Sequence, residues 1–364
     1  MNVLLVAGAR PNFMKIAPIF RASLAHPRVR CRIVHTGQHY DHEMSQTFFD
    51  ELEIPEPAFH LDAGPGSHAV QTAKIMVAFE QVCQSERPDL VLVVGDVNST
   101  LACSVVAKKL HITVAHVEAG LRSFDLSMPE EINRMVTDAI SDYFFVTEES
   151  GVLNLLNEGK APGRIHSVGH VMVDNLLYQA RRLGTGAECG FACAPLKEAA
   201  GRYLFLTLHR PSNVDCPDTF ARIARAVNQL ARERTIFFPV HPRTRAKMEQ
   251  FGIRLADPVH LLPPLGFQES LFLWQGAEAV LTDSGGLQEE TTALGVPCVT
   301  IRETTERPIT VEIGTNVLAG TETEAILAAY RQSLLQRASA RVPPQWDGRA
   351  AERIWSVLTR EIPA

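Results

Sequence analysis

Three carboxylates in the first half of the chain have the residue type needed for proton transfer. Asp96 and Glu118 each follow a short apolar run, and Glu130 opens a segment with helical spacing. Each acid alone has an ordinary structural explanation, because Asp96 can cap a helix and Glu130 can complement a helix dipole. Three carboxylates at one edge of a sheet are harder to explain, since burying like charges costs free energy unless chemistry or a cationic ligand uses them. The pattern therefore favours acid–base catalysis.

A glycine-rich turn in the second half is suited to binding an anion. An apolar run ends in Ser284-Gly285-Gly286, and a segment with helical character begins at once. The unpaired N–H groups at such a helix start and the positive end of the helix dipole both favour negative charge. Glu290, one turn into that helix, is placed to accept hydrogen bonds from ribose hydroxyls, with an ordinary exposed helix acid as the alternative. We expect an anion above this turn.

Cationic side chains follow other apolar runs. Arg10 and Lys15 come after the first run, where a pair of solvated residues at a helix start is the alternative interpretation. His209 and His241 each follow a later run, and each has an arginine within two positions. Together with Arg307 they form a set of cations suited to a diphosphate. The sequence thus predicts a nucleotide diphosphate cleft with acids on one side and phosphate-binding groups on the other.

Several familiar motifs of metal and cofactor chemistry are missing. The sequence has no Asp-x-Asp pair that would hold magnesium on a nucleotide sugar, and no Gly-x-Ser-x-Gly nucleophile turn. It also has neither the Gly-x-Gly-x-x-Gly dinucleotide fingerprint nor a phosphate-binding loop that ends in Gly-Lys-Ser/Thr. The one close cysteine pair, Cys189 and Cys193, has no nearby histidine and is better explained as loop thiols than as a zinc site. We expect metal-free acid–base chemistry without a cofactor.

Apolar or β-branched runs alternate with amphipathic stretches along the whole chain. In the first half we expect strands at residues 2–7, 29–36, 89–94, 113–117 and 143–146, with helices such as 99–110 and 130–141 between them. In the second half we expect strands at residues 203–207, 235–240, 260–262, 278–282 and 296–301, and a helix at 287–294. This alternation indicates parallel sheets with helices on both faces. Ligands of such sheets lie outside the carboxyl ends of the strands, where the candidate residues stand.

The pattern predicts an α/β fold with two doubly wound Rossmann-like domains facing across a cleft. Residues 1–180 would form the N-terminal domain with the catalytic carboxylates, and residues 200–347 the C-terminal domain that binds the nucleotide. Between them, the alternation pauses at about 181–201, where glycines punctuate small residues. The last segment, 348–364, has the spacing of a surface helix, for which packing back on the first domain is one arrangement.

Length and charge set limits on the class of protein. A chain of 364 residues suits two domains, and a net charge of −6 argues against a surface that binds nucleic acid as a whole. The apolar run at residues 3–7 is too short for a signal-peptide core or a membrane span. Seven cysteines, an odd number, suit reduced thiols. We expect a cytoplasmic protein with no nucleic-acid or membrane partner.

Six stretches together resemble the UDP-N-acetylglucosamine 2-epimerase family, whose members share the two-domain glycosyltransferase-B architecture. The stretches are Gly8-Ala9-Arg10-Pro11 with Lys15, Gly95-Asp96, residues 116–122, Pro129-Glu130-Glu131 with Asn133-Arg134, residues 281–290 and residues 304–308. They span nearly the whole chain in the family's order, which makes the match specific. The resemblance implies a small-molecule nucleotide sugar as the substrate.

Roles for individual residues follow from this resemblance. Asp96, Glu118 and Glu130 are similar to the catalytic carboxylates of the family, and His209 to a residue near the diphosphate leaving group. The residues expected to bind substrate are Arg10, Lys15, Arg134, His241, Ser284, Gly285, Gly286, Glu290 and Arg307.

The sequence also departs from the family in two of these regions. The first motif reads Gly-Ala-Arg-Pro-Asn where Gly-Thr-Arg-Pro-Glu is more usual, and the loop between Arg122 and Pro129 is shorter than in some bacterial members. Those members bind a second substrate molecule as activator, through residues just after a Gln-His like Gln38-His39. This chain has Tyr40-Asp41 there, so whether the activation is kept stays open.

The resemblance implies a reaction and leaves several alternatives. The expected activity interconverts UDP-N-acetylglucosamine and UDP-N-acetylmannosamine by elimination of UDP to a 2-acetamidoglucal and re-addition. The alternatives are hydrolysis that releases N-acetylmannosamine and UDP, epimerisation of a diacetamido uronic acid nucleotide, glycosyl transfer on the same fold, and a catalytically silent nucleotide-sugar sensor. Which carboxylate serves which face of the sugar also stays open. A homodimer is the default expectation for the assembly.

Overall fold

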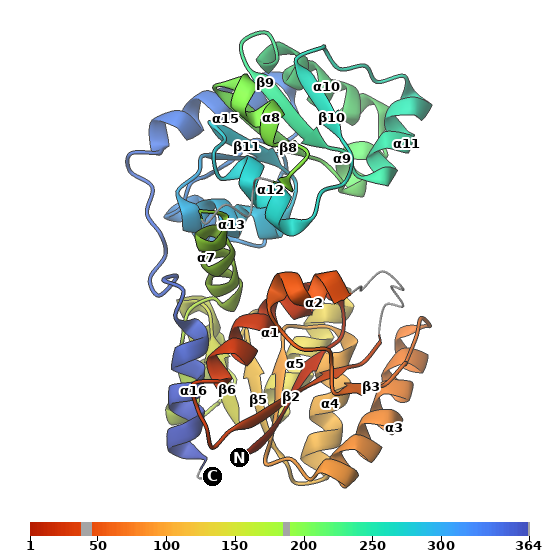
Figure 1. The fold of residues 1–364 in the computed structure, drawn as a ribbon, viewed down its shortest axis with the longest axis vertical. Coiled ribbons are helices and arrows are strands. Elements are labelled where there is room, and N and C mark those ends of the chain that lie inside the picture. Colours follow the sequence, from red (N-terminus) through yellow and green to blue (C-terminus); the bar gives the residue numbers. More distant parts are fainter. Residues whose placement is uncertain (38–45, 185–189, 363–364) are drawn as a thin grey trace. The chain divides into compact units, whose positions relative to one another are not determined.

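The computed structural model describes residues 1–37, 46–184 and 190–362, with only the backbone described for Arg10 and for residues 46–48. The chain forms two compact units (Figure 1). Unit 1 comprises Met1–Asn175 and Gln345–Ala364, and unit 2 comprises Leu176–Pro344. The stretch Gln38–Asp41, which bears on activation by substrate, lies outside the described residues, as does Cys189.

Unit 1 is built on a seven-stranded parallel sheet with the strand order β3-β2-β1-β4-β5-β6-β7. Its strands are β1 (Asn2–Ala7), β2 (Arg30–His35), β3 (Phe59–His60), β4 (Leu90–Val94), β5 (Thr113–Val117), β6 (Tyr143–Val146) and β7 (Ile165–Ser167). Its helices up to the unit boundary are α1 (Arg10–Ser23), α2 (Gln46–Leu52), α3 (His68–Glu86), α4 (Asn98–Lys109), α5 (Pro129–Ile140), α6 (Glu149–Asn157) and the 3-10 helix η1 (Pro162–Arg164). Helix α7 (Val171–Leu183) spans the boundary.

Unit 2 repeats the plan with a six-stranded parallel sheet in the order β10-β9-β8-β11-β12-β13. Its strands are β8 (Tyr203–Thr207), β9 (Thr235–Pro239), β10 (Val259–Leu262), β11 (Ala279–Thr282), β12 (Cys298–Thr300) and β13 (Asn316–Leu318). Its helices are α8 (Ala194–Ala200), α9 (Pro211–Val214), α10 (Pro217–Leu230), α11 (Pro242–Phe251), α12 (Phe267–Trp274), α13 (Gly285–Leu294), α14 (Pro308–Glu312) and α15 (Thr323–Gln336).

The predicted α/β class with two doubly wound sheets is confirmed, and burial explains why it could be predicted. Every residue of β4 is buried, and β1 is buried from Val3 onward. Strands covered by helices on both faces are continuous apolar runs rather than alternating ones, which is the pattern that the sequence shows. Each unit has its own apolar core, around β1 and β4 in unit 1 and around β8 and β11 in unit 2.

Each sheet has a topological switch point, where the chain proceeds from neighbouring strands toward opposite edges of the sheet. In unit 1 the switch point lies between β1 and β4, and in unit 2 it lies between β8 and β11. The loops after two such strands diverge and leave a crevice at the carboxyl ends, which is where doubly wound proteins bind ligands. Lys15 and Asp96 follow β1 and β4, and His209 and Ser284 follow β8 and β11. The topology therefore places candidate residues at the switch point of each unit.

The shortest elements were not predicted. Strands β3, β7 and β13 are two or three residues long, which is too short for a run of apolar residues to be recognised. Helix α8 lies inside the stretch where the alternation pauses, and Lys197 on it donates a hydrogen bond of 2.5 Å to the Phe272 carbonyl oxygen of α12. Helix α8 is thus packed on the rest of unit 2.

The last helix, α16 (Ala350–Glu361), belongs to unit 1 and packs beside α1, as the blue and red ends of the chain show in Figure 1. Asp174, buried on α7, accepts hydrogen bonds from the N–H groups of Ala350 (3.0 Å) and Ala351 (2.7 Å). It thereby satisfies two of the unpaired donors at the helix start. Trp355, fully buried, donates its indole N–H to the carbonyl oxygen of Ile19 at 2.7 Å.

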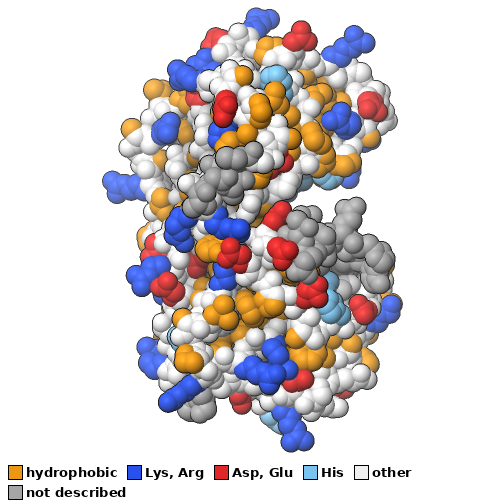
Figure 2. Space-filling view, in the orientation of Figure 1, with side chains coloured by type: hydrophobic (Ala, Val, Ile, Leu, Met, Phe, Trp, Pro, Cys, Tyr) orange, Lys and Arg blue, Asp and Glu red, His pale blue; other side chains and the backbone are white. Residues whose placement is uncertain are grey.

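The surface drawn in Figure 2 has cationic and anionic side chains interspersed over both units rather than gathered in a field of one sign. In the part of the chain that the structure describes, the helices are all too short or too polar to cross a membrane.

Candidate active site

Asp96 is held in place by residues of α5. It follows Gly95, whose positive φ of 72° turns the chain sharply at the end of β4. Arg134 donates to its carboxylate at 2.5 Å, and Asn133 donates to its backbone oxygen at 2.8 Å. Arg134 is itself fixed by two hydrogen bonds to Glu131, at 2.6 and 2.9 Å. The carboxylate of Asp96 is thus held in one orientation at the carboxyl ends of the strands and remains partly exposed.

Glu118 lies beside Lys15 at the same edge. One carboxylate oxygen accepts a hydrogen bond from the Lys15 ammonium at 2.5 Å, and the other is buried with no hydrogen-bond partner among the described residues. A Cβ atom added to Gly95 would lie 3.2 Å from the Lys15 nitrogen and 3.5 Å from Glu118. The ion pair is therefore adjacent to the Gly95-Asp96 turn. An unsatisfied carboxylate oxygen in such a place is available to accept a proton.

Glu118 also has an unusual backbone conformation, with a φ of 66°. A side chain with a Cβ costs about 1–2 kcal/mol in this left-handed region, so the surrounding structure must impose it. The N–H of Ala119 donates to the carbonyl oxygen of Phe145 at 3.1 Å, which holds the chain on the far side of Glu118. Backbone strain of this kind is typical of functional sites.

Glu130 and Arg10 are less well defined by contacts. Glu130 lies half-buried in the first turn of α5, and its carboxylate makes no hydrogen bond or ion pair with any residue that the structure describes. The side chain of Arg10 is outside the described part, although its backbone starts α1. Glu131, the neighbour of Glu130, is buried and accepts the N–H groups of Ser123 and Phe124, both at 3.0 Å. Despite the opposing effect of burial, these hydrogen bonds and Arg134 lower the pKa of Glu131.

A buried ion cluster of His116, Arg122 and Asp138 supports this edge of the sheet. His116, on β5, contacts Asp138 of α5 at 2.7 Å, and Arg122 contacts the other oxygen of Asp138 at 2.8 Å. The side chains of all three are essentially inaccessible to solvent. Sequence reasoning did not assign a role to any of them. The available signal was a histidine inside an apolar strand, which needs a polar partner when it is buried.

In unit 2, Asp283 positions His209. Asp283 is fully buried after β11, and its carboxylate lies 2.9 Å from Nδ1 of His209. It also accepts the backbone N–H groups of His209 at 3.0 Å and of Arg210 at 2.9 Å. Although burial opposes this effect, hydrogen bonds from His209 lower the pKa of Asp283 and keep it ionised. An ionised carboxylate only accepts hydrogen bonds, so Nδ1 of His209 is the donor and Nε2 is left for a ligand.

The start of α13 has open space above it. The Ser284 hydroxyl oxygen accepts the N–H of Leu287 at 3.4 Å and caps the helix. Gly285 and Gly286 have no positive φ, and a Cβ on Gly286 would meet no atom within 4 Å. Neither backbone conformation nor crowding within the protein therefore explains these glycines. Open space at a helix start is the geometry that an anion at a helix N-terminus requires.

Two further residues expected to bind substrate lie on or near α13. Glu290 is half-buried on α13, and burial, followed by the charge of neighbouring Glu289, raises its pKa to about 8. Arg307 contacts Glu289 at 3.0 Å at the edge of α14. Both residues thus interact with Glu289, Glu290 through the neighbouring charge and Arg307 through an ion pair. Their roles toward a substrate stay predictions.

His241 differs from the expected set of cations. Its Nδ1 accepts the N–H of Arg243 at 3.2 Å and so caps α11. A nitrogen that accepts a hydrogen bond carries no proton, so the ring is neutral in this conformation. Its ring centroid lies 6.3 Å from that of His209. Arg243 forms an ion pair with Asp215. This second histidine–arginine pair therefore offers less positive charge than the sequence suggested.

We expect Asp283→Asn to lower turnover by about 100-fold. The amide would present an N–H₂ group to donors that now face a carboxylate, and Nδ1 of His209 would lose the partner that fixes its tautomer. Steady-state kinetics would measure the effect. The matched control is Asp215→Asn, which removes a more exposed carboxylate partner of Arg243 in the same unit and is expected to leave turnover unchanged. Equal turnover in both variants would rule out this role of Asp283.

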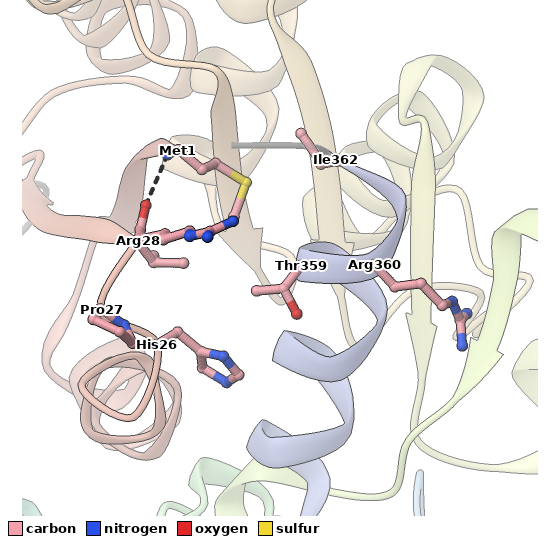
Figure 3. Close-up of a pocket in the computed structure, with 8 residues that line it drawn as sticks. Met1, His26, Pro27, Arg28, Thr359, Arg360 and Ile362 are labelled. Carbon is pink, nitrogen blue, oxygen red and sulfur yellow. Dashed lines mark hydrogen bonds between the residues drawn. The ribbon is translucent and has the colours of Figure 1, made fainter.

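The cavity drawn in Figure 3, of about 470 Å³, lies at the amino ends of the unit 1 strands, whereas the candidate residues lie at their carboxyl ends. Met1, Arg28 and Val29, which line it, precede β1 and β2 and so stand at the amino ends of the strands. The N-terminal ammonium donates to the carbonyl oxygen of Arg28 at 2.9 Å. This cavity is therefore not part of the candidate site. The described residues contain no group of three or more His, Cys, Asp or Glu side chains that could hold a metal ion.

Comparisons with known proteins identify the family. The model of the UDP-N-acetylglucosamine 2-epimerase family matches residues 21–359. A UDP-N-acetylglucosamine 2-epimerase of Methanocaldococcus jannaschii is 40% identical over 365 residues, which cover 99% of each chain. Its crystal structure in complex with UDP-GlcNAc and UDP has a TM-score of 0.84 and covers 99% of this chain and 100% of that one.

Two other similar proteins show how far the similarity extends in substrate and in fold. A UDP-2,3-diacetamido-2,3-dideoxy-D-glucuronate 2-epimerase of Pseudomonas aeruginosa is 39% identical and covers 99% of this chain and 100% of its own. A calicheamicin glycosyltransferase is 15% identical, covers 100% of this chain and 99% of its own, and has a TM-score of 0.57, which shows a shared fold alone. The two-domain fold predicted from the resemblance is thus confirmed. With its fold, its carboxylates after β4 and β5 and its glycine turn before α13, the chain belongs to the UDP-N-acetylglucosamine 2-epimerase family.

Proposed function

We propose that the protein interconverts UDP-N-acetylglucosamine and UDP-N-acetylmannosamine without hydrolysing them. Family membership over nearly the whole chain supports the reaction class. The proposal rests on the contacts of Glu118. One of its carboxylate oxygens is fixed by Lys15, and the other is buried without a hydrogen-bond partner among the described residues, next to the Gly95-Asp96 turn. This geometry suits a base that must take a proton from carbon.

The chemistry explains why acids and an anion site occur together. The C2 proton of the sugar has no neighbouring carbonyl group to acidify it, so it can leave only as the C1–O bond to UDP breaks. A carboxylate takes the C2 proton, a C1–C2 double bond forms, and UDP departs with the bonding electrons of C1–O. In the return step UDP adds to C1, and a proton reaches C2 from the other face. Charge thus grows positive on the ring and negative on the diphosphate.

The residues of unit 1 would serve the sugar. Glu118 and Asp96 are placed for proton transfer at C2 and for stabilising the cationic ring. Glu130, with no partner in the described structure, is free to act as the second proton carrier. Arg134 fixes Asp96 at 2.5 Å, so its effect on the substrate would be partly indirect.

The residues of unit 2 would serve the UDP group. The N–H groups at the start of α13 face open space and favour the diphosphate, with Ser284 and the two glycines as contacts. His209, oriented by Asp283, would donate from Nε2 to the departing oxygen when protonated. Glu290 would bind the ribose, and Arg307, His241, Lys15 and Arg10 complete the proposed set of substrate-binding residues. The reaction needs no metal ion or cofactor.

Proton exchange followed by NMR tests the proposal. The protein is incubated with UDP-N-acetylglucosamine in deuterated water, without an acceptor sugar. Deuterium at C2 of a product that still carries UDP supports the proposal. Free UDP with N-acetylmannosamine would instead establish the hydrolysing reaction. A substrate without exchange or conversion would contradict both.

A second candidate substrate is UDP-2,3-diacetamido-2,3-dideoxy-D-glucuronate. The Pseudomonas aeruginosa relative with that activity in its name is almost as similar as the archaeal one and matches over nearly the same length. Both substrates would be tested in the same exchange experiment at equal concentration. The substrate with the larger kcat/KM identifies the activity.

We expect Gly286→Asp to weaken UDP binding by at least about 100-fold. The new carboxylate would stand in the first turn of α13, where it occupies the anion site and repels the diphosphate. The Cβ of the new side chain would meet no atom within 4 Å, and the backbone has no positive φ, so we expect the fold to be preserved. Calorimetric titration with UDP measures the effect. Gly266→Asp is the matched control, because Gly266 precedes α12 in the same unit and also has open space around it. UDP binding as tight in Gly286→Asp as in the control would exclude this anion site.

We also propose a homodimer that works in the cytoplasm. The thiols support the compartment, since all six cysteines in the described part are free. An apolar surface patch of unit 1 supports the dimer, because Ile132, Met135 and Val136 are exposed at helical spacing on α5 and follow exposed Phe124 and Leu126. A second copy would cover such a patch through a two-fold axis.

Sedimentation velocity tests the assembly. The wild-type protein is expected to sediment as a dimer, and Met135→Glu as a monomer, because a charge in an apolar interface loses its hydration. Leu335→Glu, which changes an exposed apolar residue on α15 of unit 2, is the control and should leave the dimer intact. A wild-type monomer, or a Met135→Glu dimer as stable as the control, would contradict the proposed interface.

A further inference from the structure

The buried ion cluster of His116, Arg122 and Asp138 takes no direct part in the proposed reaction, yet it contacts both turns that hold the proton-transfer acids. Nε2 of His116 lies 2.8 Å from the carbonyl oxygen of Gly95, the residue before Asp96. The other turn is held by Asp138, whose second oxygen accepts the N–H of Gly120 at 3.0 Å, two residues after Glu118.

The hydrogen bonds determine the protonation state of His116. Asp138 accepts three donors, from His116, Gly120 and Arg122, so it is ionised and has no proton to give. The carbonyl oxygen of Gly95 is also only an acceptor. Both ring nitrogens of His116 must therefore donate, which makes the ring an imidazolium. Burial lowers the pKa of this histidine, but Asp138 and the Gly95 carbonyl outweigh that effect and raise it.

The charges of the cluster and of Glu158 balance, because the two cations His116 and Arg122 face the two anions Asp138 and Glu158. Glu158 forms two hydrogen bonds of 2.7 Å with the outer side of Arg122. The neighbours of His116 on the sheet, Val93 of β4 and Phe144 of β6, are apolar. The contribution of the cluster to the site is therefore the pair of hydrogen bonds that it makes with the two turns.

We propose that His116 is a positioning residue that, together with Asp138, holds the turns of Asp96 and Glu118 in register. It never touches the substrate. This inference rests on the proposed epimerase function, since it assigns the contacts that keep the two acids in place for proton transfer.

Two measurements test this role. In protein labelled with ¹⁵N-histidine, the His116 signals, assigned by their loss in His116→Gln, should show both ring nitrogens protonated at pH 8. The signals should revert to a neutral ring in Asp138→Asn. This measurement needs no substrate, so it stays valid if the proposed activity is not found. A neutral His116 at pH 8 in the wild-type protein would overturn the inference.

Kinetics supply the second readout. His116→Gln is expected to lower kcat by about 100-fold with little change in KM, because the acids lose their register.

A merely structural histidine would lower the amount of folded enzyme and leave kcat per folded molecule unchanged, and that result would overturn the inference. Asp138→Asn is the second variant, with the same expected loss of kcat at unchanged KM, in case His116→Gln does not fold. His260→Gln, which changes an exposed histidine of β10 in unit 2, is the control and should behave as wild type. Absence of C2 exchange in the wild-type enzyme would refute the proposed function and leave the NMR result standing.

Discussion

Glu118→Gln is expected to lower turnover by about 1,000-fold or more while UDP binds as before. The amide cannot accept a proton from carbon, and general bases contribute on the order of 10²- to 10⁴-fold to rate. The amide group also keeps the size of the side chain and the possibility of a hydrogen bond from Lys15, so the fold should survive. Asp96→Asn and Glu130→Gln are expected to act in the same direction.

The measurements are kcat for epimerisation, the rate of deuterium exchange at C2, and UDP affinity by calorimetry. Glu80→Gln is the control, since Glu80 is an exposed acid on α3 of the same unit. If Glu118→Gln exchanges the C2 proton at the wild-type rate, Glu118 is not the base. A variant that still exchanges the C2 proton of one epimer but not that of the other would identify the face that its missing acid serves.

Gly120→Ala is expected to destabilise unit 1 by roughly 3–5 kcal/mol, against about 1–2 kcal/mol for Gly159→Ala. Both glycines have nearly the same positive φ, 80° and 78°, so alanine suffers the same backbone strain at either position. They differ in their surroundings. A Cβ at Gly120 would lie 2.3 Å from the carbonyl oxygen of Gly151 on α6, whereas a Cβ at Gly159 would meet nothing within 4 Å.

Urea unfolding followed by tryptophan fluorescence measures this difference, because Trp346 and Trp355 are both buried in unit 1 and only Trp274 lies in unit 2. Gly159→Ala separates the cost of the backbone conformation from the cost of the contact. Equal midpoints for the two variants would show that the loop after β5 can move away from α6. In that case the position of Glu118 would not be fixed by this contact.

The sequence predicted the larger elements of the fold well, because their signals are local. The bounds of β5 (Thr113–Val117), β6 (Tyr143–Val146) and β8 (Tyr203–Thr207) agree with the expected ranges, since each is a short, largely buried run rich in β-branched, aromatic or aliphatic residues. β13 (Asn316–Leu318) was missed because it begins with a polar residue, whereas β12 (Cys298–Thr300), of equal length, lies inside the longer predicted run at 296–301.

The candidate site was predictable only in part. The positions of Asp96 and Glu118 at the carboxyl ends of their strands could be predicted, because each stands within two residues of the end of a predicted strand. Asp138 and Asp283 could not, because their histidine partners lie 22 and 74 residues away along the chain and only the folded sheet brings them together. A carboxylate that orients a histidine leaves no local sequence pattern, because the two residues meet only through a tertiary contact.

The docking of α16 on α1 has a consequence for how the protein folds in the cell. Unit 2 (Leu176–Pro344) is complete before α16 leaves the ribosome, whereas the N-terminal half must wait for Trp355 to cover α1. Domains fold as units during synthesis, and apolar surface that stays uncovered in the meantime is prone to aggregate. The half of the polypeptide made first is therefore finished last.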